Sequence, residues 1–315
     1  MRALVTGGAG FIGSNLCRGL AAEGWAVTVL DDFVVGHRAN LAGIPVRLID
    51  GDIRYPAAVD NAIEDCDVAF HLAASVGHKR SIDDPAGDSE TNLVGAINVL
   101  EAARRAGVRK VVLSSSAAVF GTPASLPVGE NQPAEPESPY GVSKLAAEKM
   151  GQVYTGLHGM EVISLRYFNV YGPRQRSDAY GNVIPVFVAR ILDGKTITIF
   201  GSGDQTRDFV HVDDVVQANM KAAAAQGVSG TFNIGTGEAT SVNALVALLR
   251  ETMPEAVESN HAEPRRFDIR DSVADIRAAG KALGYRPTMA LRQGLADYVR
   301  WVRRTRDDGG SRSVA

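Results

Sequence analysis

A tyrosine and a lysine four positions apart, Tyr140 and Lys144, form the pair in this sequence best suited to proton transfer. Residues at i and i+4 of a helix share a face. A tyrosine with its ordinary pKa of about 10 is a poor base at neutral pH, but a neighbouring ammonium favours the phenolate and lowers that pKa. The pair therefore indicates a general base with the group that tunes it. By itself it is equally compatible with a half-buried tyrosine beside a solvated lysine.

A second group of polar residues, Ser114 to Ser116, directly follows the apolar run Lys110-Val111-Val112-Leu113. The carboxyl end of a parallel strand is where such sheets present residues to ligands. A hydroxyl at this position could bond to a substrate alcohol or carbonyl. The alternative is a polar loop whose serines cap the next helix.

Glycines at positions 7, 10 and 13 lie between a predicted strand, Ala3 to Val5, and a predicted helix, Phe11 to Gly24. This spacing allows a tight turn, a close approach of backbone to a pyrophosphate, and packing of the helix on the strand. The helix N-terminus would offer N–H groups to the phosphates. Because the chain has 33 glycines, the pattern alone is weak evidence.

The residue at the end of the next strand strengthens the dinucleotide interpretation. Asp31 follows the run Val27 to Leu30 and comes 18 positions after Gly13. An acidic side chain there can accept hydrogen bonds from the adenosine ribose. No arginine follows it at once to meet a 2′-phosphate, although His37 and Arg38 lie in the next loop, so the sequence favours NAD over NADP. A turn-forming role for Asp31 is the alternative.

These residues need a scaffold of alternating strands and helices, and the sequence predicts one. Predicted strands occupy 3–5, 27–30, 46–49, 67–72, 110–113 and 162–165, and predicted helices 11–24, 57–63, 85–107 and 138–158. Such repeats predict an α/β fold with a doubly wound parallel Rossmann sheet and a smaller mixed α/β substrate-binding lobe. We expect the NAD-binding domain at 1–167, completed by later segments, and the lobe mainly at 168–305. The polar tail, 306–315, is predicted to be disordered.

The bulk properties exclude several classes of partner. The 315 residues carry a net charge of −3, which argues against nucleic acid, and no apolar stretch has the length of a membrane span. The two cysteines, Cys17 and Cys66, suit a reducing compartment and form no metal-ligand cluster. We therefore expect a cytoplasmic protein without a bound metal.

With these motifs in place, the chain resembles the extended short-chain dehydrogenase/reductases, and among them the nucleotide-sugar 4-epimerases. The resemblance runs from Val5 to about Trp301 and includes the segments Gly51-Asp52-Ile53, His71-Leu72-Ala73-Ala74 and Pro139-Tyr140-Gly141-Val142-Ser143-Lys144. It implies catalytic roles for Ser116, Tyr140 and Lys144. It also implies NAD binding by Gly7, Gly10, Phe11, Ile12, Gly13, Asp31, Asp32, Asp52, Ile53, Leu72, Ala73, Ala74, Asn92, Ser114, Tyr140, Lys144 and Tyr167.

The resemblance also implies a nucleotide-sugar site, mostly in the second lobe. Its members would be Ser116, Asn169, Arg176, Val183, Ile184, Phe187, Arg207, Arg265, Asp268 and Ser272. Two arginines suit a pyrophosphate because each guanidinium can bond two oxygens. Phe267 stands where the family usually has glycine, so Arg266 or Arg270 could replace Arg265. Family members are usually dimers formed through a helix bundle, for which the helices from Pro85 and Ser138 are the candidates.

The implied reaction is 4-epimerisation of a UDP-sugar through a transient 4-keto intermediate. The family's dehydratases and decarboxylases carry an acid after the catalytic hydroxyl, whereas Ser116 is followed by Ala117 and Ala118. UDP-glucose/galactose and UDP-N-acetylglucosamine are the expected substrates, since the small Ser272 would widen the hexose pocket. Arg176 could instead meet the carboxylate of UDP-glucuronate, although a solvated loop arginine is the simpler interpretation. An NAD(P)-dependent nucleotide-sugar reductase is a further alternative, which would want a basic residue in place of Asp31.

Overall fold

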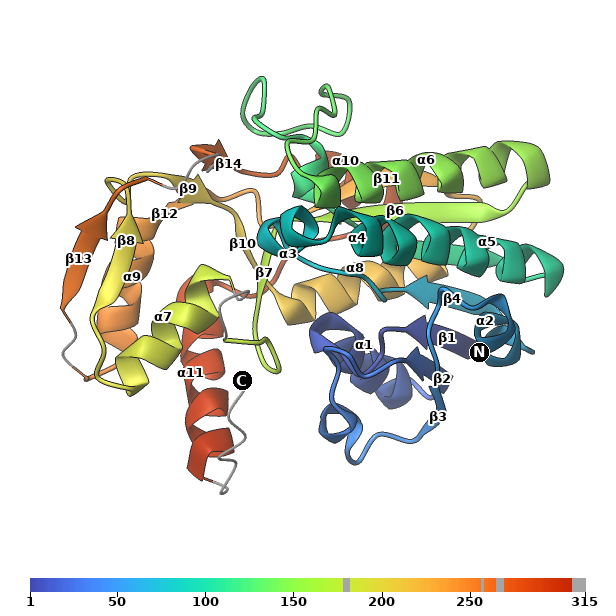
Figure 1. Cartoon of the computed structure of the whole chain (residues 1–315), viewed down its shortest axis with the longest axis horizontal. Coiled ribbons are helices and arrows are strands. Elements are labelled where there is room, and N and C mark those ends of the chain that lie inside the picture. The colour runs from blue at the N-terminus through green and yellow to red at the C-terminus, as the bar shows by residue number, and fades with distance from the viewer. Residues whose placement is uncertain (178–181, 256–257, 265–268, 308–315) are drawn as a thin grey trace.

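The computed structural model describes residues 1–177, 182–255, 258–264 and 269–307. Its centre is a seven-stranded sheet in the order β11-β6-β5-β4-β1-β2-β3, in which every neighbouring pair is parallel (Figure 1). The strands are β1 (Arg2–Thr6), β2 (Ala26–Asp31), β3 (Val46–Asp50), β4 (Val68–His71), β5 (Lys110–Ser116), β6 (Glu161–Tyr167) and β11 (Gly230–Ile234). The predicted doubly wound parallel sheet is confirmed.

Two separate layers of helices cover the sheet, and each buries an apolar core against it. One layer contains α1 (Phe11–Ala22), η1 (Arg38–Leu41), α8 (Val212–Ala224) and α10 (Arg277–Leu283). The other contains α2 (Pro56–Ile63), α5 (Gly95–Arg105) and α6 (Pro139–His158). Every residue of the central strand β4 is buried, which explains why the sequences of such strands are continuous apolar runs.

The helical stretch predicted from Pro85 to Gly107 forms in three parts. It begins as α4 (Pro85–Ser89), passes through a π-helical segment, η2 (Glu90–Val94), and continues as α5. Asp84 caps α4 by accepting a 3.0 Å hydrogen bond from the Gly87 amide. A short helix, α3 (His78–Asp83), precedes it. Widened π-helical turns change the direction of the side chains that follow, and this one carries Asn92.

The helix that carries the Tyr140–Lys144 pair has strong local signals at both ends. Ser138 accepts a 3.1 Å hydrogen bond from the Gly141 amide, and Pro139 occupies the first helical position. Gly159 ends α6 in the left-handed conformation, with φ of 66°. The short η3 (Ala117–Val119) lies next to the start of α6 and connects it with the end of β5.

The second lobe lies to one side of the sheet (Figure 1). Its core joins α7 (Val183–Leu192), β8 (Ile197–Phe200), α9 (Val242–Thr252) and α11 (Leu291–Asp307). Small sheets pair β7 (Asn169–Tyr171) with β10 (Phe209–His211), β8 with β13 (Ser259–Ala262), and β9 (Thr206–Arg207) with β12 (Thr240–Ser241) and β14 (Asp271–Ser272).

The two parts of the chain interleave around the proposed boundary at residue 167. After entering the second lobe, the chain returns with α8, which packs on α1, and with β11, which pairs with β6. Within the range 168–305, expected to form mainly the second lobe, α8 instead packs its apolar face on the large sheet. The closing helix also extends through Asp307, past the expected start of the tail at 306. No helix in the described part of the chain is long and apolar enough to cross a membrane.

Candidate active site

The glycine turn, residues 7–13, has the shape that a bound phosphate group requires. Gly7 has φ of 68°, and a Cβ there would lie 2.6 Å from the amide nitrogen of Ala73. A Cβ on Gly13 would lie 2.1 Å from the carbonyl oxygen of Gly7. Gly10 precedes α1 without any side-chain cap, so no side chain competes for the N–H groups of the first helical turn. Those groups fit a pyrophosphate, which supports the roles predicted for Phe11 and Ile12.

Asp31 lies at the end of β2, beside this turn. Its carboxylate accepts hydrogen bonds from the amides of Ala9, at 2.8 Å, and Phe33, at 2.9 Å. Burial raises the pKa of this carboxyl, against those two hydrogen bonds, which lower it. Asp31 therefore holds the turn and the next loop together, and each oxygen keeps a second lone pair that a ribose hydroxyl could use.

An open cleft of about 610 Å³ adjoins Asp31. Its lining includes Asp32, Phe33, Arg38 and Asp50. Arg38 donates a 2.6 Å hydrogen bond to Asp50, and its guanidinium lies 4.0 Å from the centre of the Phe33 ring. The arginine that could have served a 2′-phosphate is thus paired with an acid, which agrees with the preference for NAD.

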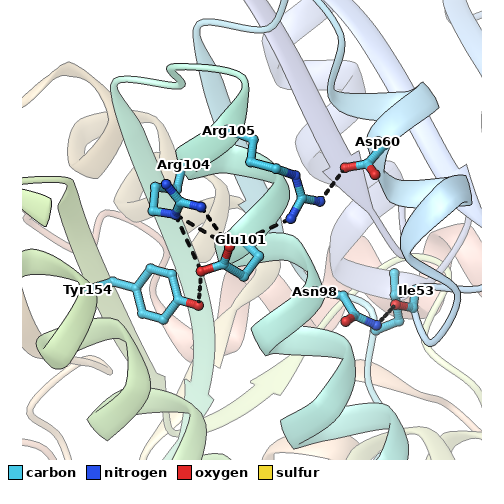
Figure 2. A network of polar contacts seen from close by, with 7 residues as sticks. All are labelled: Ile53, Asp60, Asn98, Glu101, Arg104, Arg105 and Tyr154. Carbon is cyan, nitrogen blue, oxygen red and sulfur yellow. Dashed lines mark hydrogen bonds and ion pairs between the residues drawn. The ribbon is translucent and has the colours of Figure 1, made fainter.

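The segment with Asp52 and Ile53, which the resemblance predicts to bind NAD, is held in place by hydrogen bonds from α5. The Asn98 amide donates to the carbonyls of Ile53 and Arg54, both at 3.0 Å. Figure 2 shows the first of these bonds, together with the contacts of Glu101 and Arg105 that join α5 to Tyr154 of α6 and Asp60 of α2. Ile53 is 4 % exposed, and a Cβ on Gly95 would lie 2.4 Å from its Cδ1, so this side chain is largely enclosed by protein.

The segment after β4 lies against the glycine turn. The amide of Ala73 donates a 3.2 Å hydrogen bond to Thr6, whose hydroxyl also lies 2.8 Å from Nδ1 of His71. Burial and the charge of Lys144 lower the pKa of His71 to about 3, so this imidazole is neutral. Leu72 and Ala74 are half-buried beside it. The contacts of Leu72, Ala73 and Ala74 with a cofactor stay predictions.

The structure brings together the three residues predicted to be catalytic. Ser116 ends β5 beside Tyr140; burial raises the pKa of that phenol, and the Ser116 hydroxyl acts to lower it. Lys144 lies one turn further along α6, with Nζ 6.0 Å from the centre of the tyrosine ring. Nζ donates to the carbonyl and to the hydroxyl of Ser114, at 3.0 and 3.3 Å. Tyr167 of β6 also lies close by and bonds through its hydroxyl to Asn219.

The protein's own residues do not make Tyr140 acidic. Burial raises the pKa of Tyr140 to about 12; the hydrogen bond with Ser116 acts to lower it, and the charge of Asp88 acts to raise it. Burial lowers the pKa of Lys144 to about 8, although Asp88 and Glu148 act to raise it. The expectation that Lys144 lowers the pKa of Tyr140 was wrong for the chain alone, because desolvation of the phenol is the larger effect.

Asn92, predicted to lie near the nicotinamide, belongs to a buried network under α6. Its amide nitrogen donates to the Ser75 carbonyl and Asp88 Oδ1, both at 3.0 Å, and to Ser143 Oγ at 3.1 Å. Its oxygen accepts from the Ser75 amide at 2.8 Å. The contacts that the structure shows for Asn92 are therefore internal, and its contact with a cofactor stays a prediction.

A buried ion pair supports the strand that carries the serines. Arg166 donates two hydrogen bonds to Glu148, at 2.9 and 2.8 Å, and both side chains are at most 5 % exposed. Ser115 also donates to Glu148. The guanidinium of Arg166 lies 4.6 Å from the centre of the Phe120 ring, at the position where the family usually has tyrosine. Phe120 thus contributes a cation–π contact to this support.

Three of the predicted substrate residues lie close to one another in the small sheets of the second lobe. Asn169 begins β7, directly after β6 and Phe168. Arg207 and Ser272 are register partners on β9 and β14. Arg207 donates to the carbonyls of Thr206 and Arg270, at 2.7 and 3.2 Å. Ser272 is only 8 % exposed.

The other predicted substrate residues fall into three groups. Ile184 and Phe187 pack into the core of the second lobe, with Val183 at its margin. Arg176 is half-buried on the loop after Gly172. Arg265 and Asp268, with the alternative Arg266, lie outside the described residues. The remaining alternative, Arg270, has an 89 % exposed side chain, with Nε 3.7 Å from Asp271 Oδ2.

Two further residues near the site were not singled out from the sequence. Arg174, which has φ of 72°, donates to Asn15 of α1, while Asn15 donates to the Pro173 carbonyl at 3.0 Å. These bonds join the second lobe to the helix that follows the glycine turn. His78 lies with its ring 6.4 Å from that of Tyr140. Neither was detectable by spacing, because each is brought to its partner by the fold. Within the described residues, no group of three or more His, Cys, Asp or Glu is placed to hold a metal ion.

Residues 3–235 match the model of the NAD dependent epimerase/dehydratase family. The chain is 40% identical over 313 residues to the UDP-glucose 4-epimerase of Mycolicibacterium smegmatis, with 96% of this chain and 99% of the relative covered.

Two solved structures extend this similarity to the whole fold. The UDP-glucose 4-epimerase of Thermotoga maritima, solved with UDP-glucose, superimposes with a TM-score of 0.93 at 36% identity, covering 97% of this chain and 99% of the other. MoeE5, solved with UDP-glucuronic acid and NAD, gives a TM-score of 0.89 at 35% identity, covering 97% and 100%.

Proposed function

Because the chain belongs to the NAD-dependent epimerase/dehydratase family, we propose that it interconverts the C4 epimers of a UDP-sugar through a transient 4-keto intermediate. The proposed substrates are UDP-glucose and UDP-galactose, or UDP-N-acetylglucosamine and its epimer. The similarity to the UDP-glucose 4-epimerases from M. smegmatis and T. maritima supports this choice of reaction.

The observation that carries the proposal is the placement of Ser116, Tyr140 and Lys144 at the carboxyl end of β5. The glycine turn lies at the same edge of the sheet, after β1, so a cofactor seated on the turn would reach these residues. Reversible hydride acceptance at C4 is the chemistry that bound NAD supplies. Tyr140 would take the proton of the O4 hydroxyl, Ser116 would hold the same oxygen, and Lys144 would keep a positive charge beside them.

The residues after Ser116 favour epimerisation over the family's other reactions. Elimination or decarboxylation needs an additional base or acid at a carbon of the sugar. Here the residues are Ala117 and Ala118, and the Ala118 amide donates to Ser116 Oγ at 3.2 Å. This turn carries no carboxylate, so it supplies no group for a second proton transfer, and its residues favour simple exchange of the O4 proton.

A second candidate substrate is UDP-glucuronate, favoured by Arg176. This arginine is half-buried on the loop that follows β7, and a guanidinium suits a sugar carboxylate. The binding of UDP-glucuronic acid by MoeE5 supports the same possibility. The reductase alternative has less support, because the residue that ends β2 is the acidic Asp31 and Arg38 is paired with Asp50.

The proposal is tested with purified protein and no added cofactor. Denaturation should release NAD, which is detected by its absorbance. The native protein should convert UDP-glucose, UDP-N-acetylglucosamine or UDP-glucuronate to its C4 epimer. Tyr140→Phe should abolish conversion while retaining NAD. Failure to epimerise any UDP-hexose, or full activity of Tyr140→Phe, would refute the proposed reaction or the assigned base. Activity with UDP-glucuronate alone would select the second candidate.

We also propose that the protein is a homodimer that pairs through α5 and α6. Large apolar side chains are exposed just before α5 and along α6: Val94, the last residue of η2, is 45% exposed, Val142 53%, Val153 48% and Leu157 72%. The last three recur at helical spacing on α6, the face of a 20-residue helix turned away from the sheet. A second copy can cover this stripe with its own. Sedimentation should show a dimer for the wild type and a monomer for Leu157→Glu.

A further inference from the structure

A buried carboxylate that the proposed mechanism does not use lies beneath the catalytic helix. Asp88 belongs to α4 and is 1% exposed. Its Oδ2 accepts a 2.6 Å hydrogen bond from the hydroxyl of Ser143, the residue between Tyr140 and Lys144 that precedes the lysine. Its Oδ1 accepts from the Asn92 amide at 3.0 Å. Both oxygens act as acceptors, as those of an ionised carboxylate do.

Asp88 forms no ion pair within the described residues, and Lys144 is a buried cation on which its charge acts. Glu148, the other buried carboxylate close to Lys144, forms two hydrogen bonds with the guanidinium of Arg166. Asp88, by contrast, receives only a hydroxyl and an amide among the described residues, and no ion pair is found for it there. In a region shielded from water, an uncompensated charge acts on its neighbours over a longer range than a paired one.

We propose that Asp88 is a positioning residue for the catalytic pair: its carboxylate holds the first turns of α6 on α4 through Ser143, and its charge sets the protonation balance of Tyr140 and Lys144. The inference rests on the proposed function, in which these two residues handle the O4 proton. Two links of this network reach α6 at Ser143, since Asn92 Nδ2 also donates to that hydroxyl at 3.1 Å. The π-helical turn of η2 places Asn92 where it can do so.

Several groups in the described part of the chain influence the charges of the pair. Tyr140 is surrounded by Ser116 of β5, His78 of α3, Tyr167 of β6, Asp88 of α4 and Lys144 of its own helix. Lys144 is influenced by Asp88 and Glu148 and acts in turn on the neutral His71 of β4. Asp88 acts to raise the pKa of both Tyr140 and Lys144, so removing its charge should lower both pKa values.

Asp88→Asn removes the charge and can keep the hydrogen bonds. The oxygen of the new asparagine can accept from Asn92, and its amide can donate to Ser143 Oγ. The Ser143 hydroxyl can then donate to the Tyr140 carbonyl, which lies 3.1 Å away. Asp88→Ser deletes the same charge and serves as the second variant if the first folds poorly. Asp60→Asn is the matched control, because this aspartate of α2 is exposed and pairs with Arg105 at the surface.

The first measurement is the pH profile of kcat/KM for the UDP-sugar that turns over. In Asp88→Asn both limbs should move to lower pH, by about half a unit or more, while Asp60→Asn should follow the wild type. Ser143→Ala keeps the charge and removes a contact, so kcat should fall severalfold at every pH with the limbs unmoved. An unshifted profile in the charge-deleted variants, or full kcat in Ser143→Ala, would overturn the inference.

The second measurement needs no turnover. The ultraviolet absorbance of the phenolate, taken as the difference between NAD-loaded protein with Tyr140 and with Tyr140→Phe, gives the ionised fraction of Tyr140. At a given alkaline pH this fraction should be larger in the Asp88→Asn background, and equal fractions would contradict the role of Asp88. If no UDP-sugar is epimerised, the proposed function fails while this spectroscopic result still stands. If epimerisation occurs with an unchanged profile and spectrum, only the inference about Asp88 fails.

Discussion

Gly13→Ala should separate cofactor binding from folding. The added Cβ would lie 2.1 Å from the Gly7 carbonyl oxygen and 2.8 Å from the Gly8 Cα, and both are backbone atoms of the same turn. An ordinary contact needs roughly 1 Å more, so the turn itself must shift. Such overpacking costs about 1–3 kcal/mol. Because the shift displaces the atoms that would face the pyrophosphate, we expect the affinity for NAD to fall about 10-fold to 100-fold.

A second glycine provides the matched control. Gly156 lies near the end of α6, is exposed, and would place its Cβ with no other atom within 4 Å. Gly156→Ala should raise the free energy of unfolding by up to about 1 kcal/mol, since alanine favours the helix, and should leave NAD binding unchanged. Both variants add one methyl group to a glycine, so a difference between them in NAD affinity or in the free energy of unfolding must come from the surroundings of that glycine.

The assay measures NAD affinity by calorimetry on protein stripped of cofactor, and the free energy of unfolding by denaturant titration. A folded Gly13→Ala protein whose Kd for NAD lies within about threefold of the wild type, less than one 1.4 kcal/mol step, would refute the assignment of this turn as the pyrophosphate site. The assignment would also be contradicted if the free energy of unfolding fell by as much as the free energy of NAD binding, because the added Cβ should disturb the turn alone.

Three further predictions test other parts of the site. Arg166→Ala should lower the free energy of unfolding by about 3–5 kcal/mol, because it leaves the Glu148 carboxylate buried without a cation; denaturant titration measures this. Asn98→Ala should raise the Kd for NAD severalfold without changing the KM for the sugar, because it frees the carbonyls of Ile53 and Arg54; Asp60→Asn, on the neighbouring α2, is the control. Activity should decline as the pH rises through about 8, where Lys144 loses its proton, and a profile flat to higher pH would contradict the need for its charge.

The parts of the fold that the sequence predicts are those specified by neighbouring residues. The strands β1, β2 and β4 are continuous apolar runs because both faces of the sheet are covered. The glycine spacing can be recognised in the sequence because Gly13 is limited by Gly7 and Gly8 of the same turn, whereas the contact of Gly7 with Ala73 depends on the fold. The start of α6 is visible because Ser138 and Pro139 are local signals. These features depend little on the rest of the chain.

The parts that sequence patterns missed depend on contacts between distant segments. We expected later segments to complete the large sheet, but nothing in Gly230–Ile234 indicates that this segment, β11, is the strand that joins it. Asp88 and Ser143 are 55 positions apart, and their pairing follows from the packing of α4 on α6. The sequence offered one signal: Asp88 lies four residues before Asn92, on the same helix face. That spacing predicts a local hydrogen bond between the two, and it predicts no link to α6.

The protonation of Tyr140 connects the glycine turn to the catalytic residues. A pKa of about 12 lies about five units above neutral pH, so ionising this phenol in the chain alone would cost about 7 kcal/mol at pH 7. Lys144 lies 6.0 Å from the ring centre and donates to Ser114, and only the Ser116 hydroxyl acts to lower the pKa of Tyr140 in the chain alone. The further stabilisation must therefore come with the ligands, and a positively charged nicotinamide beside Tyr140 would provide it. If NAD binds at the glycine turn as proposed, we expect the ionised fraction of Tyr140 to be larger in the NAD-loaded protein than in protein stripped of NAD.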